Sequence, residues 1–167
     1  MKHKLLLLYS WFVRILLFWI PDMPLTMRFR GWLYGLGMKQ CGQNLWVTHD
    51  AILKDLECIS IGNDVFIGNG AFIMGNIELG DEVQIAMHSV LSSNNHTSIN
   101  GSYRYGEAEI GYIKVGKGTW IAANCTLVRG AEMPCNSILA ANSCLTKKME
   151  TPNAIYGGVP AKILKIV

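Results

Sequence analysis

The chain has 167 residues, of which half are hydrophobic and 16% are charged, and its formal net charge is +3. This length suits one ordinary domain, and the apolar content excludes an intrinsically disordered chain. The small net charge argues against a nucleic-acid-binding protein, so we expect no nucleic-acid partner.

Positive charge is concentrated at the start of the chain. Residues 1–40 hold six lysines and arginines and a single acid, Asp22, whereas residues 41–167 hold nine basic and eleven acidic side chains. The sequence therefore divides into a basic, apolar N-terminal segment, residues 1–40, and a second part, residues 41–167. The five cysteines are odd in number and none stand at C-x-x-C spacing, which favours reduced thiols in a cytoplasmic protein.

The first predicted element is a helix over Leu5–Ile20, LLLLYSWFVRILLFWI, in which Arg14 is the only charged residue. A helix of this length reaches about 24 Å, short of the ~30 Å hydrocarbon core of a bilayer. Arg14 argues against a transmembrane span, and it interrupts the apolar run that a signal peptide needs. Pro21 and Pro24 are expected to end the helix.

Two interpretations of residues 1–40 stay open. In one, the helix packs on its own protein or on a neighbouring subunit. In the other, it lies in the interface of a membrane, with Trp11, Trp19 and the early lysines at the level of the headgroups. The stretch Met27–Lys39 adds basic and aromatic residues that suit both interpretations. The second would make the protein peripheral on the inner face of the cytoplasmic membrane.

From Ile61 onward the sequence repeats every six residues. The first slot of the hexad is apolar in two uninterrupted runs, which are Ile61, Ile67, Ile73, Leu79, Ile85 and Leu91, then Val115, Ile121, Leu127, Met133, Leu139 and Leu145. A second slot, four residues later, holds small or β-branched residues such as Val65, Ala71 and Cys125. Val47 and Leu53 share the period in a register shifted by two, which predicts an entry coil.

A period of six fits neither an α-helix nor a simple alternating strand. It is typical of a prism-like coil in which each hexad forms one flat side, and such coils stack about 4.8 Å apart through parallel ladders. The pattern resembles the left-handed parallel β-helix of the hexapeptide-repeat acyltransferases, and its handedness comes from that resemblance alone. We therefore expect an all-β fold, a left-handed parallel β-helix preceded by an N-terminal helical segment.

The repeat is interrupted at residues 92–114, SSNNHTSINGSYRYGEAEIGYIK, between two regular runs of hexads. A long polar excursion from a regular coil is where function commonly resides. In the acetyltransferases that act on galactosides, maltose and streptogramins, a histidine opens the loop that leaves the coil and removes the proton from the acceptor hydroxyl. His96 matches that place, so the resemblance implies that it is the catalytic base.

Two later stretches extend the resemblance to about residues 45–167. VGKGTWIAANCTLVRGA is similar to the family's I-G-x-x-V-W-I-G segment, and NAIYGGVPAKILK is similar to its closing G-x-P-A-K. Ala122 departs from the pattern because the family has glycine there, and Met74 and Val128 fill slots that are usually small. The implied substrate-binding residues are Asn69, Asn95, Glu107 and Trp120. The implied acetyl-coenzyme A-binding residues are Ala122, Ala123, Ala140, Lys147, Lys148, Gly158 and Lys162.

These residues also have plainer structural interpretations. His96 would be an ordinary loop histidine, Asn69 a turn residue at the corner of a hexad, and Glu107 a solvated carboxylate. Trp120 would be an aromatic residue packed in a subunit interface. The three lysines would serve only solubility.

The resemblance implies an acetyl-coenzyme A-dependent O-acetyltransferase that acts on a sugar hydroxyl of a bacterial surface polysaccharide or glycolipid precursor, without a metal. Cys41-Gly42-Gln43-Asn44 matches the C-G-x-N that follows a basic, aromatic stretch in such enzymes. Acyl transfer from a thioester needs a base for the hydroxyl, and imidazole suits this because it exchanges protons near neutral pH. No nucleophile elbow is present, which favours direct transfer. A homotrimer with sites between subunits is also implied.

Three other functions remain as alternatives. An N-acetyltransferase of a nucleotide-linked amino sugar usually carries an additional N-terminal nucleotide-binding domain, which we do not expect here. An enzyme like the γ-carbonic anhydrases needs three histidines that converge on zinc, and His49, His88 and His96 do not have a spacing that predicts this. A β-helical scaffold without catalytic activity is the third alternative.

Overall fold

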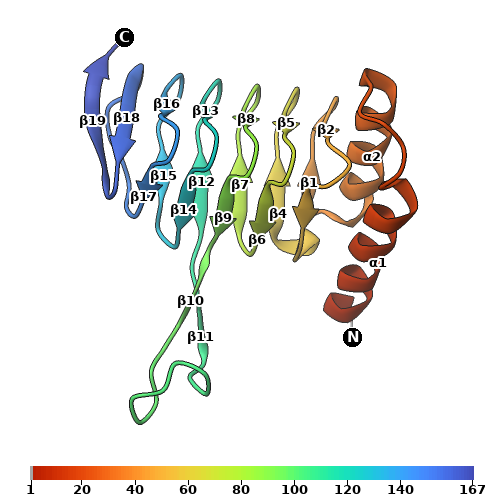
Figure 1. Cartoon of the computed structure of the whole chain (residues 1–167), viewed down its shortest axis with the longest axis horizontal. Helices are drawn as coiled ribbons and strands as arrows, with labels where there is room; N and C mark the ends of the chain where they lie inside the picture. Colours follow the sequence, from red (N-terminus) through yellow and green to blue (C-terminus); the bar gives the residue numbers. More distant parts are fainter. Residues whose placement is uncertain (1) are drawn as a thin grey trace.

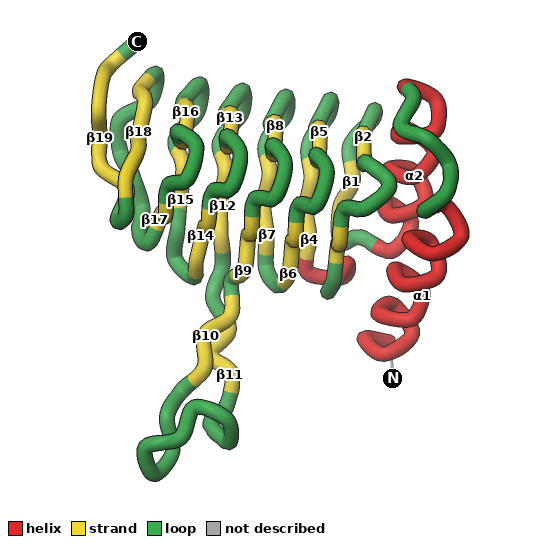
Figure 2. Tube along the Cα trace, viewed as in Figure 1, coloured by secondary structure: helices red, strands yellow, loops and turns green. Residues whose placement is uncertain are grey.

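A computed structural model describes residues 2–167 of the chain. Two helices precede a stack of short strands that coil around one long axis (Figure 1). The helices cover one end of this β-helix, a C-terminal β-hairpin lies at the other end, and a long arm projects from its side. Strands alternate with tight turns along the whole stack (Figure 2).

The N-terminal segment folds as two helices, α1 (Lys2–Leu17) and α2 (Pro24–Gly37). The predicted helix over Leu5–Ile20 therefore begins and ends three residues earlier than expected. Pro24 was expected to end a helix but instead begins one, because proline tolerates the first helical position, where no backbone N–H is required. Thr26 supports this start, since its hydroxyl oxygen accepts a hydrogen bond from the Met23 N–H at 3.0 Å.

Both helices turn one side toward the first coil of the β-helix. Val13 of α1 and Tyr34 of α2 are buried in the hydrophobic core. The Tyr9 hydroxyl donates a hydrogen bond to the Leu33 carbonyl at 2.6 Å and so joins the two helices. A Cβ at Gly31 would collide with the carbonyl oxygen of Leu45, so the absence of a side chain there allows α2 to approach the coil closely.

The coils have three flat sides, each a sheet that is named here by its first strand. The β1 face contains β1 (Gln40–Cys41), β4 (Ile59–Ile61), β7 (Ile77–Leu79), β12 (Ile113–Val115) and β15 (Glu132–Met133). The β2 face contains β2 (Trp46–Val47), β5 (Phe66–Ile67), β8 (Gln84–Ile85), β13 (Trp120–Ile121), β16 (Ile138–Leu139), β18 (Ala154–Gly158) and β19 (Ala161–Ile166). The β3 face contains β3 (Ile52–Leu53), β6 (Phe72–Met74), β9 (Val90–Ser92), β14 (Thr126–Val128) and β17 (Cys144–Leu145).

The register of the ladders follows the hexad repeat. Ile67 pairs with Ile85, 18 residues further on, which is three hexads. The entry coil is two residues longer, because Val47 pairs with Ile67, and the short 3-10 helix η1 (Leu56–Cys58) lies within it. Ile85 pairs with Ile121, 36 residues away, so the coil resumes in register after the excursion. The predicted entry coil and its shift of two are therefore present in the structure.

All twelve residues of the first hexad slot are buried, at 2% exposure or less. The residues of the second slot, from Val65 to Ser143, are buried as well. The sequence-based prediction of an inward-facing aliphatic column is therefore confirmed. Burial of each leucine or isoleucine stabilises the coil by about 2 kcal/mol, so the column is the main source of its stability.

A polar cluster around Asp22 fixes the helices to the coil. The Arg30 guanidinium, 3% exposed, donates to the Asp22 carboxylate at 2.6 Å, and Nδ1 of His49 lies 2.7 Å from the other carboxylate oxygen. The Asn69 amide donates to the same oxygen at 3.2 Å. Burial raises the pKa of Asp22, but the hydrogen bonds from His49 and Asn69 outweigh it and leave the pKa below its ordinary value. The carboxylate is therefore held in its charged form.

We expect Asp22→Asn to lower the free energy of unfolding by about 3 kcal/mol at pH 7, because it leaves the buried Arg30 charge without its partner. Because the pKa of Asp22 is lower in the fold than in the unfolded chain, where it is about 4, its contribution to stability is fully present above pH 4. The contribution is lost as the pH falls through the pKa that Asp22 has in the fold. The difference between variant and wild type, measured by urea unfolding, should therefore shrink toward pH 3.

The matched control is Glu78→Gln, which removes an ion pair with Lys114 whose side chains are 49% and 60% exposed. It should change the free energy of unfolding by less than about 1 kcal/mol. Equal effects of the two substitutions would contradict the anchoring role of Asp22.

Candidate active site

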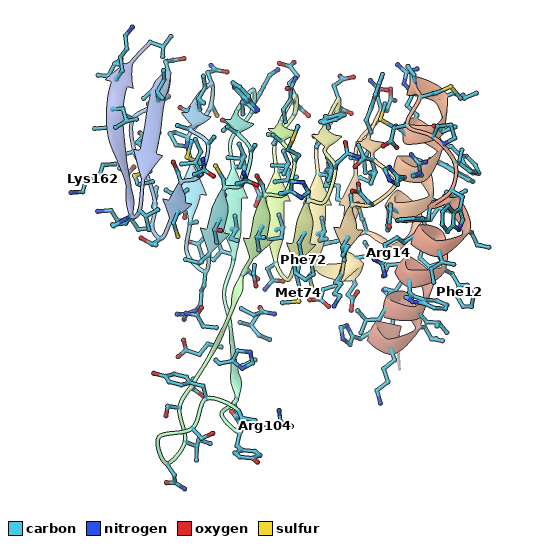
Figure 3. The ribbon with its side chains drawn as sticks, viewed as in Figure 1. Phe12, Arg14, Phe72, Met74, Arg104 and Lys162 are labelled. Atoms are coloured by element: carbon cyan, nitrogen blue, oxygen red, sulfur yellow. The ribbon has the colours of Figure 1, made fainter. Side chains whose placement is uncertain are left out.

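The arm is an antiparallel hairpin that leaves the coil between β9 and β12, at the edge where the β3 face meets the β1 face. It contains β10 (Asn94–His96) and β11 (Ala108–Ile110) and occupies residues 93–112, slightly less than the predicted 92–114. Figure 3 labels Arg104 in its outer part, far from the coils. His96, the predicted base, therefore lies on a projecting hairpin and not on the coil surface.

Hydrogen bonds tie the root of the arm to the coil before it. The buried Ser93 donates its N–H to the Met74 carbonyl at 3.2 Å, and its hydroxyl oxygen accepts the Asn76 N–H at 2.8 Å. Asn76 in turn donates its side-chain amide to the Gly111 carbonyl at 2.9 Å. Both strands of the arm are thus fixed to one turn of the preceding coil, and this orients the residues just beyond them.

The pairing of the hairpin determines which side chains share a side. His96 pairs with Ala108, and Asn95 pairs with Glu109. Because side chains alternate along a strand, His96 lies on one side of the hairpin while Asn95 and Glu107 lie on the other. The small Ala108 leaves space beside the imidazole. Asn95 and Glu107, two predicted substrate-binding residues, do not face His96 within one chain.

The imidazole of His96 is exposed, and within residues 2–167 it makes no side-chain hydrogen bond that fixes its ring. The other side of the hairpin is braced instead, because the Arg129 guanidinium lies 3.1 Å from the Glu109 carboxylate. Arg129 follows β14 in the next coil. The structure therefore holds the backbone that carries His96 and leaves the ring exposed to solvent.

Several other predicted residues lie at a different edge of the prism. Asn69 follows β5 at the edge between the β2 and β3 faces, where its amide also donates to Asp50 at 3.1 Å. Ala122, Ala123 and Ala140 form the same edge in later coils. Trp120 lies on the outer side of the neighbouring β2 face and is 46% exposed. One chain by itself does not bring these residues to His96.

The predicted lysines come together at the C-terminal end of the molecule. Lys147, Lys148 and Lys162 line a cleft of about 490 Å³, together with Tyr156 and Pro160. Lys148 lies 3.5 Å from Glu150, and both of these side chains are exposed. Lys162 projects at the end of the β-helix opposite to the helices (Figure 3). Three positive charges in one cleft suit an anionic ligand such as a phosphate.

The sequence did not identify the residues that anchor the site. Ser93 and Asn76 lie outside both hexad slots, so no periodicity marks them. His49 and His88 lie on the edge between the β2 and β3 faces, away from the arm, and no group of three or more metal-binding side chains occurs in the described part of the chain. The geometry of a zinc site like that of the γ-carbonic anhydrases is therefore not found among these histidines.

Comparisons with known proteins agree with this architecture. Residues 59–93 match the family model described as bacterial transferase hexapeptide (six repeats). Over 126 residues, 74% of this chain, the sequence is 27% identical to the galactoside O-acetyltransferase of Escherichia coli strain K12, and the match spans 62% of that protein. The chain thus spans less than two thirds of this relative's length.

Solved structures extend the likeness to almost the whole fold. A hexapeptide-repeat acetyltransferase from Vibrio cholerae, solved in complex with acetyl coenzyme A, matches 98% of this chain and 87% of its own with a TM-score of 0.83 at 20% identity. An N-acyltransferase from Bacillus cereus, solved with dTDP and coenzyme A, matches 78% of this chain and 84% of its own with a TM-score of 0.65 at 17% identity. At these identities the likeness concerns the fold.

The predicted fold, a left-handed parallel β-helix of hexapeptide repeats, is therefore confirmed. The confirmed features are the six-residue period, the three parallel sheets and the arm between two coils. Residues 59–93 thus carry the hexapeptide repeat that this family model describes, and the fold of the chain is that of solved acetyltransferases built from the same repeat.

Proposed function

We propose that the protein is an acetyl-coenzyme A-dependent O-acetyltransferase with His96 as its general base. The observation that carries this proposal is the exposed imidazole of His96, which stands on a hairpin anchored to the coil by Ser93 and Asn76. The relation to a galactoside O-acetyltransferase over 74% of the chain supports a sugar hydroxyl as the acceptor. The proposed acceptor class is a bacterial surface polysaccharide or a glycolipid precursor.

The proposed reaction is a direct transfer in one active site. His96 takes the proton of the acceptor hydroxyl as the oxygen attacks the thioester carbonyl, so that a C–O bond forms. The carbon–sulfur bond breaks, and the departing thiolate of coenzyme A receives the proton from the imidazolium. Burial raises the pKa of the Cys125 thiol, which makes this residue a poor nucleophile and argues against a covalent intermediate on it.

The lysine cleft supports the proposed binding of acetyl coenzyme A. Phosphate groups of the nucleotide part would bind Lys147, Lys148 and Lys162, while the pantetheine arm would follow the edge formed by Ala122, Ala123 and Ala140. These small side chains leave room for an extended ligand along the stacked coils. A homologous fold solved with acetyl coenzyme A agrees with this assignment.

We also propose a homotrimer in which two chains complete each site. In a single chain, His96 and the alanine edge lie at different corners of the prism. The outward rows of the β2 and β3 faces carry half-buried apolar residues, such as Phe66, Phe72 and Val90, whereas the β1 face presents Glu78 and Lys114. Two apolar faces and one polar face suit a closed three-fold assembly whose interfaces use the two apolar faces.

N-acetylation of an amino sugar is the second candidate. A structural likeness to an N-acyltransferase solved with dTDP and coenzyme A favours it. The likeness covers 78% of this chain at 17% identity, so it concerns the fold and not the acceptor. A screen of acetyl-coenzyme A turnover against neutral sugars, oligosaccharides and nucleotide-linked amino sugars distinguishes the two candidates. Turnover that requires a free amine on the acceptor indicates N-acetylation, and turnover of neutral sugars indicates O-acetylation.

We expect His96→Ala to lower kcat by about 10²–10⁴-fold, because a general base acts only as the proton moves. The dissociation constant of acetyl coenzyme A should change little. The matched control is His88→Asn, since His88 has φ of 57° at a coil corner and asparagine tolerates that backbone. Near-full activity of His96→Ala with the true acceptor would remove the proposed base.

The double substitution Lys147→Ala and Lys162→Ala should raise the KM for acetyl coenzyme A about tenfold while kcat stays nearly constant. The reason is that phosphate contacts bind ground state and transition state alike. Lys117→Ala, which removes an exposed lysine paired with Glu82 in the middle of the coil, should leave the KM unchanged. An unchanged KM in the double variant would place the coenzyme elsewhere.

Light scattering of the full chain at micromolar concentration should give three times the mass of one chain. Phe72→Glu, which places a charge on the β3 face, should shift this mass toward that of a monomer and abolish activity together with it. A stable monomer in the wild type would contradict the shared-site proposal.

A further inference from the structure

The helices α1 and α2 turn a second, outward side toward solvent, and this side is apolar. On each helix the exposed apolar residues recur at intervals of three or four and so form a stripe along its length. We call the two stripes together the helical face, which consists of Leu5, Leu8, Phe12, Leu16 and Trp19 from α1 and its end, and Leu25, Phe29, Trp32 and Leu36 from α2. Figure 3 shows Phe12 pointing away from the coils.

The outward apolar residues of the helical face are not needed to cover the end of the β-helix. The inward sides of the helices already close the end of the β-helix through Val13 and Tyr34. In contrast, Trp19 is 87% exposed, Leu25 78% and Leu16 71%. Contiguous apolar surface on this scale marks an interaction site.

The charges around the helical face indicate what covers it. Lys2, Lys4 and Arg28 are exposed beside the stripes, and Arg14 is half-buried. The only acid within residues 2–40 is Asp22, which Arg30 and His49 already engage. Two acids of the coil, Asp55 and Glu57, lie beside His3 at the start of α1. The face is therefore apolar with a rim in which basic side chains outnumber acidic ones, and this suits a partner with an apolar interior and a negatively charged surface.

The aromatic residues point to the same partner. Of the five tryptophans in the chain, Trp11 lies on α1, Trp32 lies on α2 and Trp19 follows the end of α1, and each is at least 46% exposed. Tryptophan favours the boundary between hydrocarbon and headgroups, because its ring is apolar and its N–H needs a polar partner. We propose that the helical face binds the surface of an anionic lipid bilayer, with both helices lying in the plane of the interface.

The lengths of the helices agree with an in-plane position. At 1.5 Å per residue, helices of 16 and 14 residues are about 24 and 21 Å long. Across residues 2–167, no helix is both long and apolar enough to cross a membrane. The lysines and arginines that flank the stripes are tolerated at the depth of the headgroups, whereas a charge in the hydrocarbon core would be costly.

This position leaves the candidate active site in water. The helices cover the first coil, and the arm with His96 leaves the third, between β9 and β12. Two coil spacings of about 4.8 Å and a helix layer of about 10 Å place the root of the arm roughly 20 Å from the lipid surface. If the proposed trimer forms with its axis along the coils, three helical faces meet the same membrane, and effective concentration strengthens a weak contact.

The test is flotation of the full-length protein with vesicles of phosphatidylcholine that contain or lack phosphatidylglycerol. We expect the protein to float with the anionic vesicles and to partition at least about tenfold less into the neutral ones. Tryptophan emission should shift to the blue only with the anionic vesicles. High salt should weaken the binding because it screens the basic rim.

The double substitution Phe29→Glu and Trp32→Glu should lower partitioning into anionic vesicles at least about tenfold, because it puts charge in the middle of the stripe on α2. A milder variant, Trp32→Ser, should lower it less and guards against misfolding of the first. Ile166→Glu changes a residue that is 64% exposed at the opposite end of the molecule and is the matched control.

Failure of the wild type to float with anionic vesicles would overturn the proposal. So would a concentration-dependent increase in mass beyond the trimer that Phe29→Glu and Trp32→Glu abolish, since a second copy would then cover the helical face. Turnover of acetyl coenzyme A, measured without vesicles on a soluble acceptor, reports separately on the proposed function. A wild-type protein that turns over acetyl coenzyme A but does not bind anionic vesicles therefore contradicts only this inference and leaves the proposed function standing.

Discussion

The aliphatic column inside the coil is the constraint on which the rest of the structure depends. One inward residue per hexad, from Ile61 to Leu145, stacks on its equivalent in the next coil, and each is almost completely buried. Parallel ladders set the spacing between coils, so any residue added to a hexad would rotate every later side out of register. Extra chain is tolerated only where it leaves the coil and returns to the same position.

The arm satisfies this condition. Leu91 and Leu127 remain directly paired although 36 residues separate them, which equals two whole coils. The excursion therefore begins and ends at one edge, and the hydrogen bonds of Ser93 and Asn76 close its root. Because the coil beneath it is rigid, the arm can carry His96 outward with a defined direction. The coil formed by the hexads thus positions the candidate base His96, although His96 itself lies outside the hexads.

The sequence predicted what periodicity controls and missed what depends on single long-range contacts. The hexads predicted every buried residue of the column, and the shifted register of Val47 and Leu53 predicted the longer entry coil. The second helix, α2, was not predicted, because Pro24 was expected only to end a helix. The anchoring role of Asp22 was also missed, since its partners Arg30 and His49 are 8 and 27 residues away. No local pattern encodes such a pairing.

The placement of the candidate residues follows from the same geometry. Asn69 lies at the edge after β5, whereas the arm with His96 leaves the coil at the edge after β9, one full coil and one further side along the chain. The two residues are therefore at different edges of the prism. The edges of a three-sided prism are separated by its faces, so two edges of the same chain cannot come together. In the proposed trimer, a second chain packed against the β3 face would bring one of its edges beside the first chain's arm. The rigidity that orients His96 is therefore also the reason that we propose a site shared between subunits.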